Sequence, residues 1–323
     1  AHYVDCFTTV SEITNNECRE LLDKPADVVL MNGFEDDFVP KGATFTGKRK
    51  RARSTMLRVA NCLLGEDLGD DTLIIGTSGR YEFKNKGIDV FLESLNRLNR
   101  DKDLKKKVLA FVNVPSWVGD PREDLQKRLK SKDKFTEPLQ CPFITHWLHN
   151  MTHDQVLDML KYLGMGNRPE DKVKVIFVPC YQDGHDGILN KHYYDLILGE
   201  DLSVYPSYYE PWGYTPLESV AFRVPTITTD LAGFGLWVNS LKNQHGINDG
   251  VEVLHRSDYN YSEVADGIKD TVALFSTKTE AEIKEIRKRA GQVAEQALWK
   301  HFIQYYYEAY DIALRNAMKR QLK

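Results

Sequence analysis

The sequence has few of the features that mark several large classes of protein. Its five cysteines are scattered and odd in number, without a CxxC pair or a Cys/His cluster, which excludes a disulfide framework and a zinc finger. No apolar run approaches the roughly 18 residues that cross a bilayer, and the first residues form no signal sequence. These absences predict a cytoplasmic protein with reduced thiols and no membrane contact.

Charge of one sign and the common catalytic motifs are also scarce. A formal net charge of −4 over 323 residues gives no global field that attracts nucleic acid. We interpret the one basic run, KRKRAR at residues 48–53, as a solvated face or loop without function. GxxxxGK[ST], GxSxG and HExxH are absent, and the nine histidines form no metal pattern. We expect a small-molecule partner, no metal and no cofactor.

What is present is an alternation of β-branched apolar runs and helical patterns. Residues 87–99 place apolar side chains at helical spacing, as do residues 217–222 and 261–275. Strand-like runs occur at residues 71–76, 107–114, 172–179, 202–207, 225–229 and 251–255. This order predicts an α/β fold with a Rossmann-like doubly wound parallel sheet, which binds ligands at the carboxyl ends of its strands.

Two stretches interrupt the alternation. Residues 115–170 are too long for one crossover and include a helical pattern at 155–163, so we expect a helical insertion used for packing or oligomer contact. Residues 278–323 read as carboxyl-terminal helices, the last with too much aromatic surface for a solvated tail. We expect that aromatic helix to dock on another part of the protein.

The most informative segment is YYEPWGYTPLES, residues 208–219. Glu210 and Glu218 flank a turn at which Thr215 is a good N-cap and Pro216 suits the first helical position, so TPLE predicts a capping box. The helix-start amides favour an anion such as a phosphate beside Glu210. In isolation such a motif more often only caps a helix, but this one carries two Tyr and a Trp that are typical of a pocket wall.

Two more segments follow predicted strands. GTSGRYEFKNKG places Arg80 and Lys86 where both cations can meet a diphosphate; the alternative is a surface ion pair with Glu82. TTDLAGFG places Gly233 and Gly235 where the backbone can approach a ligand, although a GxG pair alone is weak evidence.

Together these segments resemble a known family. FTTVSEIT (7–14), MNGF (31–34), GRYEFKNKGIDVFLESLNRLN (79–99), PSYYEPWGYTPLES (206–219) and TTDLAGFG (228–235) closely resemble glycogen synthases of the animal and fungal type, in the order of their carboxyl-terminal half. The resemblance implies one half of a GT-B glycosyltransferase. Such an enzyme transfers glucose from UDP-glucose to a glycogen or α-1,4-glucan acceptor, with retention and without a metal.

The resemblance also implies roles for particular residues. Arg80 and Lys86 would hold the diphosphate, and Glu210 would be the key carboxylate at the donor glucose. Glu218 would bind the ribose hydroxyls, and Tyr193 would stack on the uracil. The amides of Tyr214 and Thr215 would meet the phosphates.

The same resemblance predicts the domain organisation. Residues 1–40 would be the end of a missing amino-terminal domain and its linker, residues 41–277 the donor-binding domain and residues 278–323 the carboxyl-terminal helices. The chain starts at Ala1 in what reads as mid-domain sequence, so we expect a part of a longer, homo-oligomeric protein and feeble transfer by this part alone.

The chain departs from the family pattern at two places. A family histidine is replaced near Asp201. The helix that binds glucose 6-phosphate in regulated members has its basic residues diluted here by acids such as Glu280 and Glu282. Two other functions stay open: a nucleotide-sugar-binding module without catalysis, and a different nucleotide-sugar glycosyltransferase of the same fold.

Overall fold

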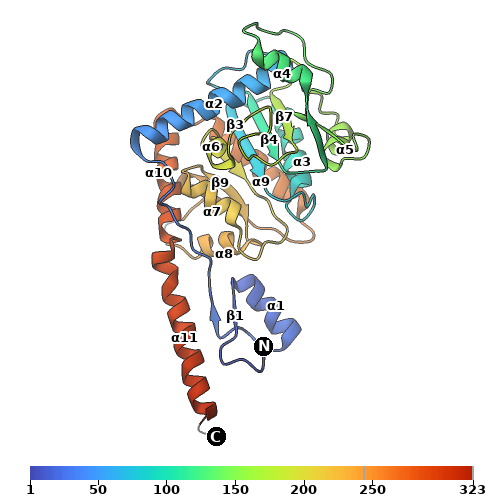
Figure 1. Ribbon diagram of the computed structural model, residues 1–323. Helices are drawn as coiled ribbons and strands as arrows, with labels where there is room; N and C mark the ends of the chain where they lie inside the picture. Colours follow the sequence, from blue (N-terminus) through green and yellow to red (C-terminus); the bar gives the residue numbers. More distant parts are fainter. Residues whose placement is uncertain (243, 322–323) are drawn as a thin grey trace.

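The computed structural model describes residues 1–242 and 244–321, and a six-stranded sheet forms its centre (Figure 1). Every pair of neighbouring strands is parallel. The strands are β3 (Leu73–Ser78), β4 (Val108–Asn113), β7 (Val173–Val178), β8 (Leu202–Val204), β9 (Thr226–Thr229) and β10 (Val251–Leu254). Each overlaps one of the six predicted runs, so the predicted doubly wound parallel sheet is confirmed.

The order of the strands fixes where a ligand can bind. Across the sheet the order is β10-β9-β8-β3-β4-β7. The chain starts in the middle at β3, moves outward through β4 to β7, and returns to the other side of β3 to build β8, β9 and β10. The winding direction therefore reverses between β3 and β8, as in a Rossmann fold, and a crevice opens at that point beyond the strand ends.

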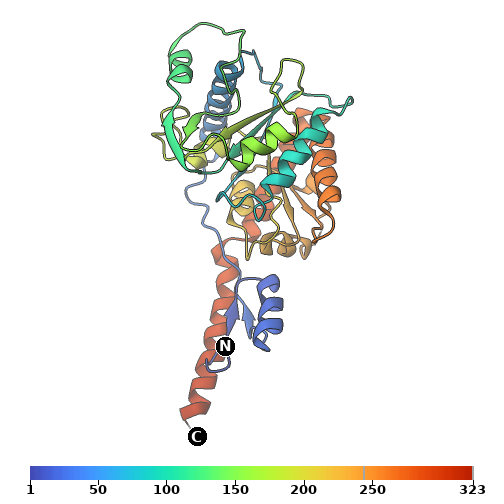
Figure 2. The same cartoon turned by 90° about the vertical axis from the view of Figure 1, so that its right-hand side faces the viewer.

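Helices cover both faces of the sheet, as Figures 1 and 2 show. Leu73 and Ile75 point to one face, where α3 (Ile88–Asn99), α5 (Gln155–Tyr162) and α9 (Tyr261–Ser276) pack on them. Ile74 points to the other face, toward α2 (Gly42–Leu64) and α6 (Tyr193–Ile197). This alternation follows from the two-residue period of a strand. Burial of a side chain such as Leu95 contributes about 1.5–3 kcal/mol.

A second core holds the carboxyl-terminal helices against the sheet. It joins α7 (Tyr214–Ala221) and α8 (Gly233–Asn239) to α10 (Glu280–Gln296) and the start of α11 (Trp299–Gln321). Phe302 of α11 packs edge-on against Trp212, with ring centroids 6.0 Å apart. The predicted docking of the aromatic helix is thus confirmed for its first turns.

The first residues form a small separate unit beside α11 (Figure 2). It consists of α1 (Glu12–Leu22) and the paired strands β1 (Thr8–Thr9) and β2 (Val28–Val29). Asn316 of α11 donates a hydrogen bond of 2.8 Å to the Asp5 carbonyl. Phe34 then pairs with the junction of α10 and α11, where the Trp299 amide donates to the Phe34 carbonyl.

The predicted helical insertion is only partly helical. Besides α5 it contains α4 (Glu123–Lys130) and an antiparallel ribbon of β5 (Val118–Pro121) and β6 (His146–Leu148). Its short apolar runs lack a clear period, so sequence alone did not reveal the ribbon. One short 3₁₀ helix, Ile247–Asp249, precedes β10. Among the described residues, no helix combines the length and apolar character that crossing a bilayer requires.

Candidate active site at the switch point of the sheet

Two loops leave the sheet at the switch point, and they are joined to each other. The loop after β3 carries Arg80 and Lys86, and the loop after β8 carries Glu210. The amide of Tyr208 donates a 2.8 Å hydrogen bond to the carbonyl of Asn85, which ties the loops together. The predicted cationic and acidic segments therefore lie at one edge of the sheet.

Lys86 and Glu210 form an ion pair across these loops. The Lys86 ammonium donates to Oε2 of Glu210, and the two side chains are only 15% and 19% exposed. The contact depends on Gly87, the residue after Lys86. Its φ of 67° suits glycine, and because it has no side chain the Pro206 carbonyl can approach it closely. Partial burial strengthens the attraction between the two charges and also adds the cost of removing them from water.

Arg80 has a more open position than Lys86. Its guanidinium lies 3.1 Å from Oε1 of Glu82, and its side chain is 78% exposed. This contact is the surface ion pair with Glu82 that the sequence left open as the alternative. Arg80 also lines a cavity of about 340 Å³ together with Tyr193 and Thr215. An exposed pair of this kind contributes little to stability. Arg80 can therefore turn to an anion in the cavity at small cost.

The helix start at residues 214–218 differs from the predicted capping box. Helix α7 begins at Tyr214, its N-cap is Gly213 with φ 105°, and no side chain caps it. The predicted N-cap role of Thr215 is wrong because the positive φ of Gly213 lets the chain enter the helix two residues earlier. The first amides of a helix lack intrahelical acceptors, so those of Tyr214 and Thr215 remain suited to an anion.

Glu218 is held by a tyrosine instead of by the helix end. Tyr194 donates a 2.8 Å hydrogen bond to Oε1 of Glu218. Burial raises the pKa of the Glu218 carboxyl, and the hydrogen bond from Tyr194 partly opposes that rise. Sequence reasoning missed Tyr194, because only the position of α6 next to α7 shows that its hydroxyl reaches Glu218.

Tyr193 lines the cavity, and its hydroxyl is held by hydrogen bonds. The hydroxyl lies 3.0 Å from Oγ of Ser78, which also bonds the hydroxyl of Tyr205. Tyr205 in turn bonds Ser219 at 2.8 Å. Burial raises the pKa of Tyr193 well above its ordinary value, so it stays a neutral hydroxyl. The rest of the cavity wall includes Asn113 and Gln182, which sequence reasoning also missed.

The predicted glycines support the site from behind. A side chain at Gly233 would collide with the Pro211 carbonyl, and one at Gly235 with the Thr229 carbonyl. The amide of Gly233 donates a 3.0 Å hydrogen bond to the carbonyl of Glu210. Both glycines are buried, and the space that they leave is filled by the protein's own backbone. Their visible function is to let this segment pack behind the Glu210 loop, whereas ligand contact stays a prediction.

The basic run at residues 48–53 is not the solvated face that we expected. It lies on α2, where Arg49 and Arg53 both donate to the carboxylate of Asp201. Asp201 also accepts from the Ile74 amide, which anchors α2 and the start of β8 to β3. Although burial raises the pKa of Asp201, Arg53 and Arg49 hold it below its usual range. Asp201, near which the resemblance implied the loss of a family histidine, thus has a structural role.

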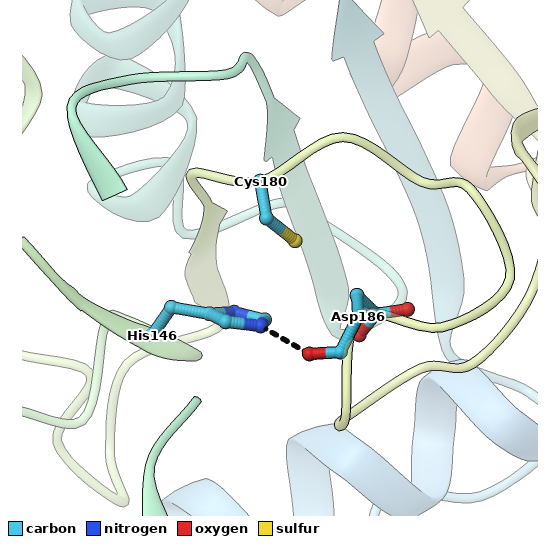
Figure 3. A group of neighbouring side chains, drawn as sticks. All are labelled: His146, Cys180 and Asp186. Atoms are coloured by element: carbon cyan, nitrogen blue, oxygen red, sulfur yellow. Dashed lines mark hydrogen bonds between the residues drawn. The ribbon is translucent and has the colours of Figure 1, made fainter. Parts of the chain in front are cut away.

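One group of possible metal ligands occurs in the described part of the chain (Figure 3): His146, Cys180 and Asp186, with ligand atoms within 4.8 Å of one another. Nε2 of His146 lies 2.7 Å from the carbonyl of Asp186, and Nδ1 lies 2.9 Å from the Thr145 hydroxyl. The Asp186 carboxylate accepts three backbone amides of its own loop. Burial raises the pKa of the Cys180 thiol to about 12. The hydrogen bonds of His146 and Asp186 therefore hold the loop that precedes Tyr193 in place.

Solved structures share this fold. The catalytic domain of starch synthase IV from Arabidopsis thaliana, bound to ADP and acarbose, superimposes with a TM-score of 0.58 at 12% identity, covering 95% of this chain and 55% of that one. WaaG, a glycosyltransferase involved in lipopolysaccharide biosynthesis, superimposes with a TM-score of 0.53 at 12% identity, covering 94% of this chain and 62% of that one. These likenesses show the fold of the chain, which is that of part of a GT-B protein.

The sequence comparisons are more specific. The sequence model of the family described as glycogen synthase matches residues 1–120 and 120–323, and the chain belongs to that family. It is 28% identical to glycogen [starch] synthase of Neurospora crassa over 98% of this chain and 53% of the relative. It is 29% identical to isoform 2 of glycogen [starch] synthase from Saccharomyces cerevisiae, over 100% of this chain and 55% of the relative. It is 26% identical to the liver glycogen [starch] synthase of Mus musculus, over 98% of this chain and 52% of the relative. The chain spans about half the length of these relatives.

Proposed function

We propose that this chain supplies the donor-binding half of a glycogen synthase. The protein would transfer glucose from UDP-glucose to the non-reducing end of an α-1,4-glucan and retain the anomeric configuration. Membership of the glycogen synthase family supports this reaction. The observation that carries the proposal is the ion pair of Lys86 and Glu210 at the switch point, next to the start of α7.

The proposed division of labour follows from charge. Arg80 and Lys86 neutralise the negative charge that grows on the diphosphate as the bond to glucose breaks, and the amides of Tyr214 and Thr215 add their dipoles. These groups are in position before the reaction, so little reorganisation is needed when charge develops. Glu210 faces the donor glucose and holds Lys86 in place until the phosphates arrive.

The rest of the nucleotide is assigned to neighbouring side chains. Glu218 accepts hydrogen bonds from the ribose hydroxyls, and the ring of Tyr193 stacks on the uracil. Support comes from the cavity of about 340 Å³ that Arg80, Tyr193 and Thr215 line together. A ligand in that cavity can reach a cation, an aromatic face and a helix start at once.

The acceptor-binding side is proposed to come from an amino-terminal domain whose last part is residues 1–40. The contact between Tyr209 and Glu17, 2.6 Å from hydroxyl to carboxylate, supports a joint between that unit and the Glu210 loop. We further propose a cytoplasmic location, which suits the five free cysteines, and a homo-oligomeric full-length protein.

The test is transfer of radiolabelled glucose from UDP-glucose to glycogen by the full-length protein, with Glu210→Ala as the paired variant. We expect label in the polymer for the unchanged protein and a loss of on the order of 10²-fold or more for the variant. UDP-glucose binding without any transfer would instead favour a nucleotide-sugar-binding module.

A further inference from the structure

Helix α6 places two consecutive tyrosines on two different parts of the candidate site. Tyr193 bonds Ser78 at the end of β3, as described above. Tyr194 turns to α7, where its hydroxyl donates to Oε1 of Glu218 at 2.8 Å. Adjacent residues of this five-residue helix therefore reach the end of β3 and the middle of α7.

The ring of Tyr194 is fixed by aromatic contacts on its sides. It stacks on Phe222 at the end of α7 with a centroid distance of 5.1 Å and an interplanar angle of 1°. Phe38, from the segment that precedes α2, packs on it at 5.1 Å and 52°. Because the ring is held by two other parts of the chain, the direction of its hydroxyl is set independently of Glu218.

Glu218 has few other partners. Among residues 1–242 and 244–321, Tyr194 is the one side chain that bonds its carboxylate, and no cation pairs with it. Oxygen Oε1 is thus occupied, and Oε2 is left to accept from another donor. A carboxylate with one oxygen fixed and one available suits a neighbouring pair of hydroxyls.

We propose that Tyr194 is a positioning residue for the ribose of the nucleotide, acting through Glu218; the inference rests on the proposed function, in which Glu218 binds that sugar. Tyr194 holds the carboxylate at one rotamer before the ligand arrives. Without it, Glu218 has to be ordered when the nucleotide binds, and that ordering reduces the affinity.

The hydrogen bond also favours the ionised form of Glu218. Burial raises the pKa of Glu218, and the groups that face it are three tyrosines, Tyr193 and Tyr194 on α6 and Tyr214 on α7. Burial raises the pKa of each of these phenols as well, so none is charged near neutral pH. Loss of the Tyr194 hydroxyl therefore raises the pKa of Glu218 further, and its carboxylate fraction falls sooner as pH decreases.

The experiment measures the affinity of the protein for UDP and for 2′,3′-dideoxy-UDP by calorimetry. It compares the unchanged protein with Tyr194→Phe, Glu218→Ala and the double variant. Phenylalanine keeps the ring and both aromatic contacts, so the fold should be retained, and a thermal melt checks this. We expect Tyr194→Phe to weaken UDP binding by roughly 10-fold or more, the range for a hydrogen bond to a charged group.

Three comparisons distinguish positioning from general damage. Tyr194→Phe should not change the affinity for the dideoxy ligand, and it should add nothing in the Glu218→Ala background. It should also move the acid-side fall of UDP binding to higher pH. Equal losses for both ligands, or normal UDP binding by Tyr194→Phe alongside weak binding by Glu218→Ala, would overturn the inference. If Glu218→Ala itself binds UDP normally, the assignment of the ribose to Glu218 is wrong and the proposed function fails at this residue.

Discussion

Lys86 and Glu210 lie 124 residues apart in the sequence and form one partly buried ion pair at the point where the sheet reverses its winding. Neither residue is placed by its own helix or strand, since both sit in loops. Their positions are set by Gly87, by the Tyr208–Asn85 hydrogen bond and by the segment that packs behind Glu210. The pair is therefore a product of the fold and a sensitive point at which to test it.

The first prediction concerns Lys86. Replacing it by alanine in the full-length protein should lower kcat for glucosyl transfer by on the order of 10²-fold or more, because one preorganised charge beside the diphosphate is lost. Lys84→Ala is a matched control, since Lys84 is an exposed cation in the same loop. Turnover of Lys86→Ala at the rate of Lys84→Ala would show that this ammonium does not meet the phosphates.

The second prediction concerns Arg80. Its alanine variant should bind UDP roughly 10-fold more weakly, because a charged hydrogen bond to the diphosphate is removed, and Arg80→Lys should recover part of the loss. Folding stability should change by less than about 0.5 kcal/mol, since the Arg80–Glu82 pair is exposed. Titration calorimetry measures the affinity, with Arg100→Ala as an exposed control at the far end of α3. Equal affinities for the two variants would remove Arg80 from the site.

The third prediction separates backbone strain from packing. Gly87 and Gly164 have φ of 67° and 69°, but only at Gly87 would a side chain collide with another loop. Gly164→Ala should cost about 1–2 kcal/mol from the left-handed backbone. Gly87→Ala should cost about 1–3 kcal/mol more and also weaken UDP binding, since Lys86 is displaced. Chemical denaturation of both variants gives the difference, and equal losses would contradict the close contact with Pro206.

The fourth prediction concerns Asp201. Its removal leaves Arg49 and Arg53 without their carboxylate in a mostly buried place, so Asp201→Asn should destabilise the protein by about 3–5 kcal/mol. Asp36→Asn, which breaks only the exposed pair with Lys41, should change stability by less than about 0.5 kcal/mol. Urea denaturation at neutral pH compares the two, and a small loss for Asp201→Asn would argue against the α2 anchor.

The same residue predicts a pH dependence. The pKa of Asp201 is lower in the folded than in the unfolded protein, so its contribution is complete above the unfolded value and is lost as pH falls through the folded value. The free energy of unfolding should therefore decrease less in Asp201→Asn than in the unchanged protein as pH falls through the acid range. Parallel denaturation curves of both proteins over the acid range measure this, and identical pH slopes would contradict it.

Much of the fold could be predicted from the sequence, because buried parallel strands and amphipathic helices have strong local patterns. All six strands of the sheet and helix α3 follow from such patterns. Helix α2 could not be predicted, since its KRKRAR run resembles a solvated segment, and the carboxylate that pairs with it comes about 150 residues later. The β5–β6 ribbon is too short for its alternation to be read.

The candidate site was predictable to the level of loops but not of contacts. Motifs located Arg80, Lys86, Glu210 and Glu218 at two strand ends. The capping-box interpretation was wrong because sequence does not show that Gly213 takes a positive φ. The pairing of Glu218 with Tyr194 depends on how α6 lies against α7, which no local pattern contains.

The most direct test of the whole account is a crystal structure of the protein with UDP bound. We expect the two phosphates within hydrogen-bond distance of Lys86, Arg80 and the first amides of α7, with the ribose at Glu218. UDP bound instead in the cavity of about 850 Å³ between α1, α8 and α11, away from Lys86, would contradict it.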